Sequence, residues 1–429
     1  MSSRSIKRHL FPRKVLASAV TVAVSCLALA ACGSSEDPAA ASGSGENAES
    51  TIPEPTDDGV AAGLLRVMNP NVSPDDIAPE TQLAMMSGDV ELTADQQKTW
   101  EDCMSNTSCE IGSGKYVMAF IDDQVNAYVS LQRGEAFDYA IKSGEISKII
   151  TLTNAGDVQK VLSDFRSAMA QGANLIVGMW AGTGNQLGPV FDEAKSRNIP
   201  IVNASVQFSP EVASKQAVQF ERDLCAMWAD GATKLNEAVA GKANPTYAMF
   251  TGIPGNGYAA QWQPCAQEAL DKLGWSKSYE GTTDWSPQGT VEAASALRAS
   301  GKNPDAIIYD SSLEDFINAY LDAGAKEIPA MANGGSAYIG QAKAFKKAID
   351  AGADLTVLQA PADIWIARNS VATELAIVDD GKASTDVMKY PMSFSDMSDF
   401  MDTVDLSQDD FALMGSLLTP EQSAFAIKH

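Results

Sequence analysis

Few side chains in this chain are suited to acid–base or nucleophilic chemistry. Its 429 residues include only two histidines, His9 near the start and His429 at the end. That distribution argues against a Ser-His-Asp triad, a histidine general base and a histidine-ligated metal site. Carboxylates remain candidates for a hydrolase, although the sequence alone does not pair them. We therefore expect that the protein is not an enzyme and holds neither a cofactor nor a metal ion.

Phosphate-bearing partners are not favoured by the charge or by the motifs. The formal net charge is −24, and a chain this acidic repels a phosphate backbone, so we expect no nucleic-acid partner. The glycine-rich turn Gly252–Gly257 precedes a predicted helix, a position that can bind phosphate. It lacks the Lys-Ser/Thr pair of a P-loop and the spacing of a dinucleotide fingerprint. Nucleotide binding is therefore not expected.

Strands and helices alternate along the body of the chain. In the stretch Gly172–Ser205, the runs Asn174–Met179 and Ile199–Val202 predict two strands that flank a glycine-rich turn and a helix. Such βαβ units build parallel sheets and place ligands beyond the carboxyl ends of the strands, where Trp180 and Asn203 lie. About ten alternations follow one another, which exceeds one doubly wound sheet. We therefore expect two α/β domains.

Residues 1–31 have the features of a secretory signal peptide. Basic residues are followed by the apolar segment Val15–Ala30, which is too short for a comfortable membrane span. The sequence Leu29-Ala30-Ala31-Cys32-Gly33 resembles a bacterial lipobox. In lipoproteins of that kind the chain is cleaved before the cysteine, which then carries lipid. We expect Cys32 to be lipidated; an ordinary secreted protein with a chance cysteine is the alternative.

Two further segments precede the α/β body. Residues 32–58 are rich in Ser, Gly, Ala, Glu and Pro, a composition that predicts a disordered linker. Residues 59–113 predict a small helical extension. Within it, Thr93 and Gln96 have the spacing of a capping box and predict a helix from Ala94 to about Met104.

The cysteines predict disulfides. Cys26 leaves with the leader and Cys32 takes lipid, so four of the six remain: Cys103, Cys109, Cys225 and Cys265. An even number in an exported chain favours disulfides, with three possible pairings. One pairing would close a small loop between Cys103 and Cys109, and a Cys225–Cys265 bond would then join two helices. A zinc site is disfavoured because the spacing is wrong and no histidine is available.

The order of elements resembles a known family. From about Lys115 to Asp399 the chain is similar to the type I periplasmic binding proteins, in particular the ribose-like sugar-binding branch that serves ABC transporters. The residues that carry the resemblance are Asn126-Ala127-Tyr128, Gly172–Val177, Ala194-Lys195, Ile199–Val202, Gly252–Gly255, Asp284-Trp285, Ala323-Gly324 and Leu358-Gln359. No single motif is decisive, but the ordered set behind a lipobox is specific.

The resemblance implies a fold and a domain organisation. The fold would be α/β, with two doubly wound parallel-sheet lobes joined by a three-strand hinge that closes around a solute. Lobe 1 would take 114–218 and 360–389, and lobe 2 would take 219–359 and 390–402. Residues 403–429 form a tail beyond the family core.

The resemblance also implies candidate ligand-binding residues. Sugar sites of this family combine aromatic rings with polar groups that bind hydroxyls. Tyr128, Trp285 and Gln359 lie where the family uses an aromatic, a stacking aromatic and a hinge-side glutamine. For these three residues the alternative is packing in the core. For Asn126 the alternative is a helix cap, and for Trp180 burial in the core is slightly favoured. The full set is Asp122, Asn126, Tyr128, Trp180, Ser205, Trp262, Trp285, Tyr309, Asp310, Asn333 and Gln359.

Several of these positions depart from the family pattern. Ser205 stands where the family often has an Asp-Arg pair, and Trp262 stands where it has an arginine. Asn333 replaces an aspartate, and Tyr309-Asp310 replaces an asparagine. The usual charged clamps for hydroxyls are therefore missing, and an anion would lack its arginine partner. We expect a neutral or cationic solute.

By this resemblance the protein is a lipid-anchored extracytoplasmic substrate-binding protein of an ABC importer. It would be a monomer that captures a sugar or polyol and delivers it to permease subunits in the membrane. One alternative is a sensor lipoprotein that presents its solute to a membrane receptor, and another is a nucleoside or cationic solute. A transcriptional repressor with this core would need a DNA-binding head and a basic surface, which the lipobox and the charge exclude.

Overall fold

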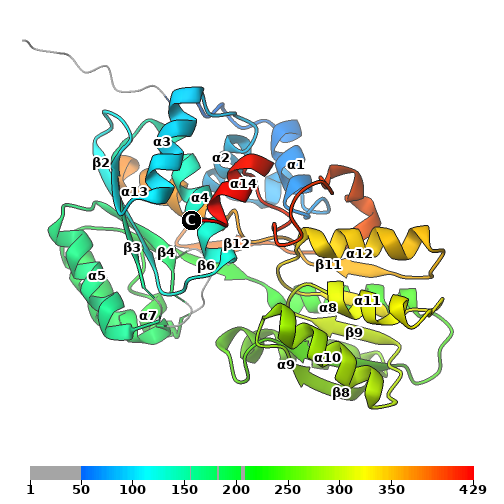
Figure 1. The fold of residues 1–429 in the computed structure, drawn as a ribbon. Coiled ribbons are helices and arrows are strands. Elements are labelled where there is room, and N and C mark those ends of the chain that lie inside the picture. The colour runs from blue at the N-terminus through cyan, green and yellow to red at the C-terminus, as the bar shows by residue number, and fades with distance from the viewer. Residues whose placement is uncertain (1–49, 155, 181–182, 204–207) are drawn as a thin grey trace, which may run out of the picture. The chain divides into compact units, whose positions relative to one another are not determined.

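The computed structural model describes residues 50–154, 156–180, 183–203 and 208–429 (Figure 1). These residues belong to one unit of the chain, 45–429. The predicted signal peptide, Cys32 and Ser205 lie outside the described residues. Among the helices that are described, none combines the length and apolar character needed to cross a membrane.

Five strands form the first sheet, in the order β1-β3-β2-β4-β5. Their bounds are β1 (Ser108–Glu110), β2 (Tyr116–Asp122), β3 (Ile146–Thr153), β4 (Leu175–Met179) and β5 (Ile201–Asn203). β1 is antiparallel to β3 and the other pairs are parallel. Successive residues of β2 alternate between two apolar clusters, because side chains of a strand point to opposite faces. The sheet is therefore covered on both faces.

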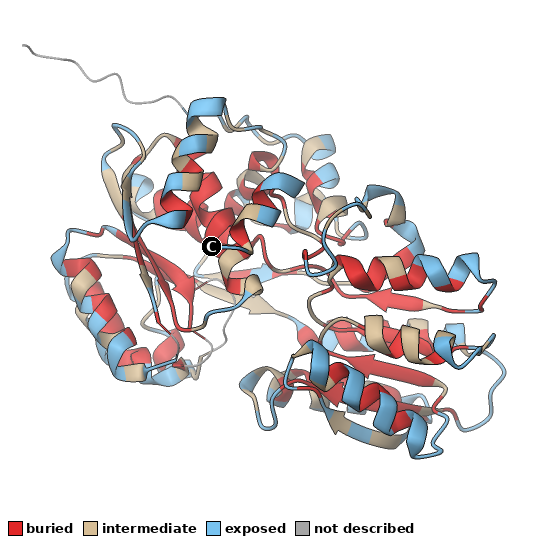
Figure 2. Ribbon diagram, in the orientation of Figure 1, coloured by how far each residue is buried: buried red, intermediate tan, exposed pale blue. Residues whose placement is uncertain are grey.

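Helices supply both covering layers. One cluster contains α4 (Ala127–Ser143) and α13 (Ile366–Asp380), and the other contains α5 (Val158–Ala170) and α6 (Gly188–Ser196). Figure 2 shows α5 with one buried side and one exposed side, as expected for a helix that covers a sheet. The short helices η2 (Gly184–Leu187) and α7 (Pro210–Ala213) flank α6 in the sequence.

The second sheet has six strands, in the order β13-β11-β10-β9-β7-β8. The strands are β7 (Thr246–Thr251), β8 (Ser276–Thr282), β9 (Ala306–Tyr309), β10 (Ala330–Asn333), β11 (Val357–Gln359) and β13 (Ser395–Asp396). Only β13 is antiparallel to its neighbour among these strands. One face packs on α10 (Pro287–Ala299), α11 (Glu314–Asp322) and α12 (Ile339–Asp350), and the other on α8 (Leu224–Ala238) and α9 (Gly257–Lys272).

Three segments connect the two sheets. The chain enters the second lobe through β6 (Gln219–Arg222), returns through 360–365 into α13, and leaves again through β12 (Val387–Tyr390). β6 and β12 pair in parallel as a two-stranded sheet of their own. Two doubly wound α/β lobes are the fold class that the sequence predicts, and that prediction is confirmed. Of the three hinge strands that it also predicts, two are present as β6 and β12, whereas 360–365 connects the lobes without forming a strand. The exact lobe bounds stay a prediction.

The segments before and after the lobes are ordered. They comprise α1 (Asp57–Arg66), η1 (Pro74–Asp76), α2 (Pro79–Ser87), α3 (Ala94–Ser105), η3 (Met397–Asp399), η4 (Met401–Thr403) and α14 (Pro420–Ala426). Thr93 and Gln96 form the predicted capping box at the start of α3. The region also contains β1, which the sequence analysis did not foresee. A three-residue strand has too short a pattern to be recognised before its partner β3 is known.

Two disulfides tie local elements together. Cys103 and Cys109 join α3 to β1, and Cys225 and Cys265 join α8 to α9. This is the pairing that the sequence spacing suggested among the three possibilities. It places both bonds between neighbouring elements of the same part of the fold.

Helix α4 is buried on nearly all sides although it carries several charges. α13, α2, α3 and α14 all pack against it. Arg368, on α13, forms ion pairs with Glu135 and Asp138, and Lys142 donates to Asp138 at 2.6 Å. The tail joins the same network, because Leu417 N donates to Glu135 Oε1 at 2.8 Å. The charges are thus paired at the point where both terminal segments meet lobe 1.

Candidate functional site

Asp310 organises the strand ends of the second lobe. It follows β9 and is only 4% exposed. Its Oδ2 accepts hydrogen bonds from Thr251 Oγ1 at 2.5 Å and Trp262 Nε1 at 3.0 Å, and its Oδ1 accepts one from Trp285 Nε1 at 2.9 Å. Burial raises the pKa of Asp310, and these donors act in the opposite direction. The carboxylate is therefore engaged by protein donors and positions two indoles.

Trp285 is held as a rigid aromatic surface. The indole remains 40% exposed while its N–H is bound by Asp310. Its ring lies on the backbone of Gly252, where a Cβ atom would overlap the ring atoms Cδ2 and Cε2. Asp284 and Trp285 both have positive φ, 53° and 48°. Such conformations cost about 1–2 kcal/mol per non-glycine residue and concentrate at functional sites. The exposed position of this ring therefore depends on two residues in an unfavourable backbone conformation.

We predict that Gly252→Ala displaces the Trp285 ring. The added Cβ has no room beneath the indole, so overpacking should lower the free energy of unfolding by about 1–3 kcal/mol. Gly257→Ala is the matched control in the same turn, because nothing lies within 4 Å of its Cβ position. Urea denaturation of both variants measures the difference. Equal stability of the two variants would show that the ring does not rest on Gly252.

Asn333 and Gln359 belong to one buried amide network. Asn333 ends β10 and Gln359 ends β11, and the two are register partners in the sheet. Gln341, on α12, accepts from Asn333 Nδ2 at 3.1 Å and donates to Gln359 Oε1 at 2.9 Å. Gly335 N donates to Asn333 Oδ1 at 2.8 Å, and Gln359 Nε2 donates to Gly335 O at 2.9 Å. The network fixes the loop that follows β10.

The remaining aromatic candidates are buried. Trp262 stacks on Trp228 with ring centres 5.0 Å apart, in the core between α8, α9 and the second sheet. Tyr309 shares a 2.5 Å hydrogen bond with the Thr283 hydroxyl, and burial raises its pKa to about 12. Trp180 lies in the first lobe and donates to Ile121 O at 2.8 Å. Its burial agrees with the core-packing interpretation that the sequence analysis slightly favoured.

A polar cluster joins the connecting segments to helices of both lobes. Tyr128, on α4, donates to Asp363 Oδ1 at 2.8 Å, and Arg222 at the end of β6 forms an ion pair with Asp363 Oδ2. The Arg222 guanidinium lies 5.4 Å from the ring centre of Tyr258, on α9. Tyr258 donates to Gly334 O at 2.7 Å. Burial raises the pKa of both tyrosines, so both remain protonated donors at neutral pH.

The strand ends of the first lobe carry two buried carboxylates. Asp122 ends β2, and Asp123 Oδ2 accepts from Thr183 N at 2.6 Å. Burial raises the pKa of Asp122 well above its usual range, and the charge of Arg133 opposes that shift. Asp122 Oδ1 has no hydrogen-bond partner among the described residues. Asn126 caps α4, since its Oδ1 accepts from Val129 N at 3.0 Å.

A family model identifies the fold. It is described as a periplasmic binding protein domain, and it matches residues 119–382, more than half of the chain. The chain belongs to the periplasmic binding protein family. The resemblance to type I periplasmic binding proteins that the sequence suggested is therefore confirmed. No curated protein matches the sequence.

Solved structures share the periplasmic binding protein fold at low identity. A ribose ABC transporter protein from Conexibacter woesei is 16% identical with a TM-score of 0.56, over 68% of this chain and 96% of its own. A myo-inositol-bound solute-binding protein from Bacillus halodurans is 12% identical, with a TM-score of 0.55 and coverage of 68% and 98%. A D-allose-bound protein from Actinobacillus succinogenes is 16% identical, with a TM-score of 0.55 and coverage of 68% and 100%. At such identities the likeness shows the fold.

The sequence analysis did not name five polar residues of the clusters described above: Arg133, Arg222, Tyr258, Gln341 and Asp363. The expectation of a site without arginine considered only the positions implied by the resemblance. Arg222 lies in a connecting strand and Arg133 lies two turns into α4, so neither occupies such a position. Both arginines lie among other charged or polar residues of their elements, a composition that also fits a solvated face, so nothing in the sequence marked them.

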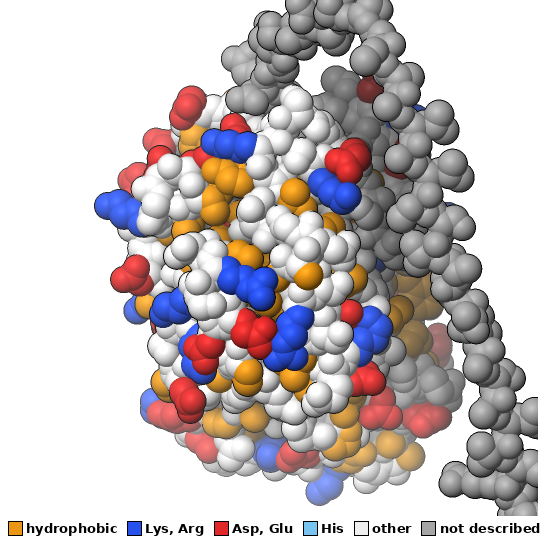
Figure 3. All heavy atoms as spheres, turned by 90° about the vertical axis from the view of Figure 1, so that its left-hand side faces the viewer, with side chains coloured by type: hydrophobic (Ala, Val, Ile, Leu, Met, Phe, Trp, Pro, Cys, Tyr) orange, Lys and Arg blue, Asp and Glu red, His pale blue; other side chains and the backbone are white. Residues whose placement is uncertain are grey.

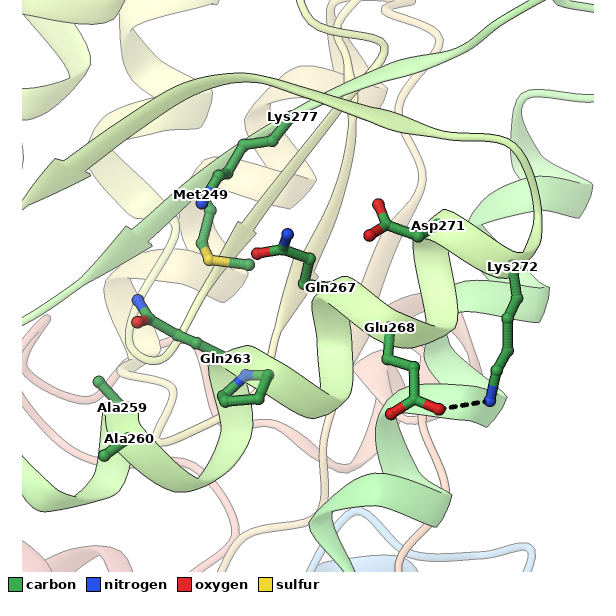
Figure 4. Close-up of a pocket in the computed structure, with 10 residues that line it drawn as sticks. Met249, Ala259, Ala260, Gln263, Gln267, Glu268, Asp271, Lys272 and Lys277 are labelled. Carbon is green, nitrogen blue, oxygen red and sulfur yellow. Dashed lines mark ion pairs between the residues drawn. The ribbon is translucent and has the colours of Figure 1, made fainter.

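A hollow on the second lobe lies away from the candidate site. It measures about 710 Å³ and is lined mainly by α9, with Met249 of β7 and Lys277 of β8 (Figure 4). Lys277 is near the amino end of its strand, whereas Asp310 follows the carboxyl end of β9. In this fold ligands bind beyond the carboxyl ends. The hollow is therefore not part of the candidate site.

Charges of both signs lie on the surface of the described residues. Figure 3 shows one face on which acidic and basic side chains are interspersed. Some of the exposed charges are paired, as Arg166 is with Glu193.

Proposed function

We propose that this chain is the solute-binding protein of an ABC importer and captures a small neutral solute, a sugar or polyol, between its two lobes. It works outside the cytoplasm as a monomer, is tethered to the membrane through lipid on Cys32, and delivers its solute to permease subunits. The tether rests on the lipobox in the sequence alone.

The Trp285 ring is the observation that carries this proposal. It lies at the carboxyl end of β8, where ligands of doubly wound sheets bind, and its N–H and one face are already occupied by Asp310 and Gly252. An exposed, pre-oriented indole is suited to stacking on the C–H face of a sugar or polyol ring. Similar solved structures hold myo-inositol and D-allose, which supports the same solute class here.

A thermal-shift screen of the protein without residues 1–32 tests the proposal. The panel contains myo-inositol, D-allose, D-arabinose and D-ribose, with amino acids and nucleosides as comparison classes. A solute that binds only the folded state adds about 2.7 kcal/mol of stability at a hundredfold excess over Kd. A shift with one sugar or polyol is expected. Shifts only with amino acids or nucleosides would contradict the solute class, and no shift with any compound would contradict solute capture.

A further inference from the structure

The N-terminal extension is bonded to the connecting segments of the hinge. Val67 O accepts a hydrogen bond from Ala362 N at 2.9 Å, in the connection that leads into α13. Asn69 Nδ2 donates to Tyr390 OH at 3.1 Å, at the end of β12, and to O of the next residue, Pro391, at 2.9 Å. Asn69 is completely buried. The turn Val67–Asn71, called the 67–71 turn below, therefore contacts two of the three connections.

The same turn reaches the second lobe. Met68 is 2% exposed and packs in the apolar cluster that contains β9, α11 and α12. It does so with a φ of 60°, a conformation that costs a methionine about 1 kcal/mol or more. Asn71 Nδ2 donates to Ser395 Oγ at 3.2 Å, in β13 of the second sheet. Packing must outweigh the backbone cost, so the turn is adapted to this contact.

The body of the extension is attached to the first lobe. α2 packs on α13 and α4, and α3 packs on α4. Trp100 Nε1 donates to Gly134 O at 3.0 Å, and Lys142 Nζ donates to Ser87 O at 2.9 Å. The extension thus joins the first lobe to the second through contacts that lie outside the three chain connections.

The arrangement held by these contacts leaves the strand-end loops accessible. Val125, after β2 in the first lobe, is 70% exposed. Ile253 and Trp285, after β7 and β8 in the second lobe, are 51% and 40% exposed. All three side chains are therefore open to solvent in this arrangement. A solute that is enclosed between the two sets of loops must therefore bring them together.

We propose that the 67–71 turn is a hinge clasp that stabilises the accessible arrangement and so limits solute affinity from outside the binding site. The inference rests on the proposed function, capture of a solute by closing lobes. Contacts that favour one of two arrangements reduce the affinity of any ligand that binds the other. Asn69 and Asn71 do not touch the strand-end site, so their effect on binding passes through the hinge.

Two variants separate the clasp from folding. Asn69→Ala removes the buried bonds to Tyr390 and Pro391, whereas Asn71→Ala changes an exposed residue and leaves the core intact. The control is Asn106→Ala, which removes a 2.7 Å bond to Asp102 O within the extension, away from the hinge. Titration calorimetry with myo-inositol, D-allose, D-arabinose and D-ribose compares them with the unaltered protein. We expect both clasp variants to bind the solute about fivefold more tightly than the unaltered protein, which is the lower end of usual coupling strengths. The affinity of the control should equal that of the unaltered protein.

Small-angle scattering of the solute-free proteins provides a readout that needs no solute. The clasp variants are expected to show a smaller radius of gyration than the unaltered protein and the control. Unchanged scattering, or affinity that is unchanged or weaker in Asn71→Ala, overturns the clasp. If none of the four compounds binds the unaltered protein, the proposed solute class is contradicted instead. The scattering comparison then still tests whether the 67–71 turn holds the lobes in the accessible arrangement.

Discussion

Replacing Arg368 by alanine is expected to lower the free energy of unfolding by about 3–5 kcal/mol. Arg368 is completely buried and forms ion pairs with Glu135 and Asp138, which are also buried. Its Nη1 donates to Ser87 Oγ at 3.1 Å, which adds α2 to the network. Removing the guanidinium leaves buried Glu135 without a cation and leaves Asp138 with Lys142 alone, and a buried charge that loses its partner is costly. Urea denaturation followed by circular dichroism measures the loss.

An exposed ion pair of the same chemistry is the control for Arg368. Arg166 forms hydrogen bonds with Glu193 at 2.6–3.1 Å, but both side chains remain substantially exposed. Arg166→Ala should therefore lower the free energy of unfolding far less than Arg368→Ala does. If the two alanine variants were equally stable, the network between α4, α13 and the terminal segments would contribute nothing. Limited proteolysis should cleave the tail earlier in Arg368→Ala than in Arg166→Ala. Arg368 holds Glu135, and Glu135 in turn binds Ser416 and Leu417 of the tail.

Replacing Trp285 by alanine is expected to weaken solute binding at least about tenfold, or ~1.4 kcal/mol. The indole is the exposed aromatic surface at the strand ends, and a stacked ring contributes through both its area and its geometry. The measurement is titration calorimetry with the sugar or polyol that gives the largest thermal shift. The affinity of Trp285→Phe should lie between those of the unaltered protein and Trp285→Ala, because phenylalanine keeps a ring but loses the bond to Asp310.

Phe411 provides the matched control for Trp285. It is an aromatic residue that is 56% exposed, in the tail. Phe411→Ala should leave solute affinity unchanged. Unchanged binding in Trp285→Ala would remove the main support for the proposed site. A loss of affinity in both variants would point to a general effect on folding instead, which the unfolding free energies would reveal.

The elements of this fold could be predicted because their signals are local. Continuous apolar runs mark β2 and β4, and apolar positions with period 3.6 mark α5 between them. The capping box at Thr93 starts α3 through contacts within four residues. By contrast, β1 and β12 are short, and each exists because a distant strand supplies its hydrogen-bond partners. Their own residues have no periodicity long enough to detect.

The candidate site could be predicted only in part. Trp285 and Asp310 were both named through the family resemblance, but their bond joins residues 25 positions apart, and nothing in the sequence paired them. The structure uses both oxygens of Asp310 for protein donors. Arg222 and Asp363 are 141 positions apart, and nothing local marks them as a pair. Such pairs depend on which connections meet at the hinge.

Local patterns in the sequence were sufficient to predict the alternating strands and helices and the start of α3, because periodicity and caps act over a few residues. The family followed from the resemblance of an ordered set of motifs. Only the tertiary structure decided that the extension contacts the hinge, that Asp310 holds Trp285 against Gly252, and that Arg368 joins both terminal segments to α4. These contacts link residues far apart in the chain. They form because burying a charge or an amide requires a partner, and packing of the whole chain selects which partner is within reach.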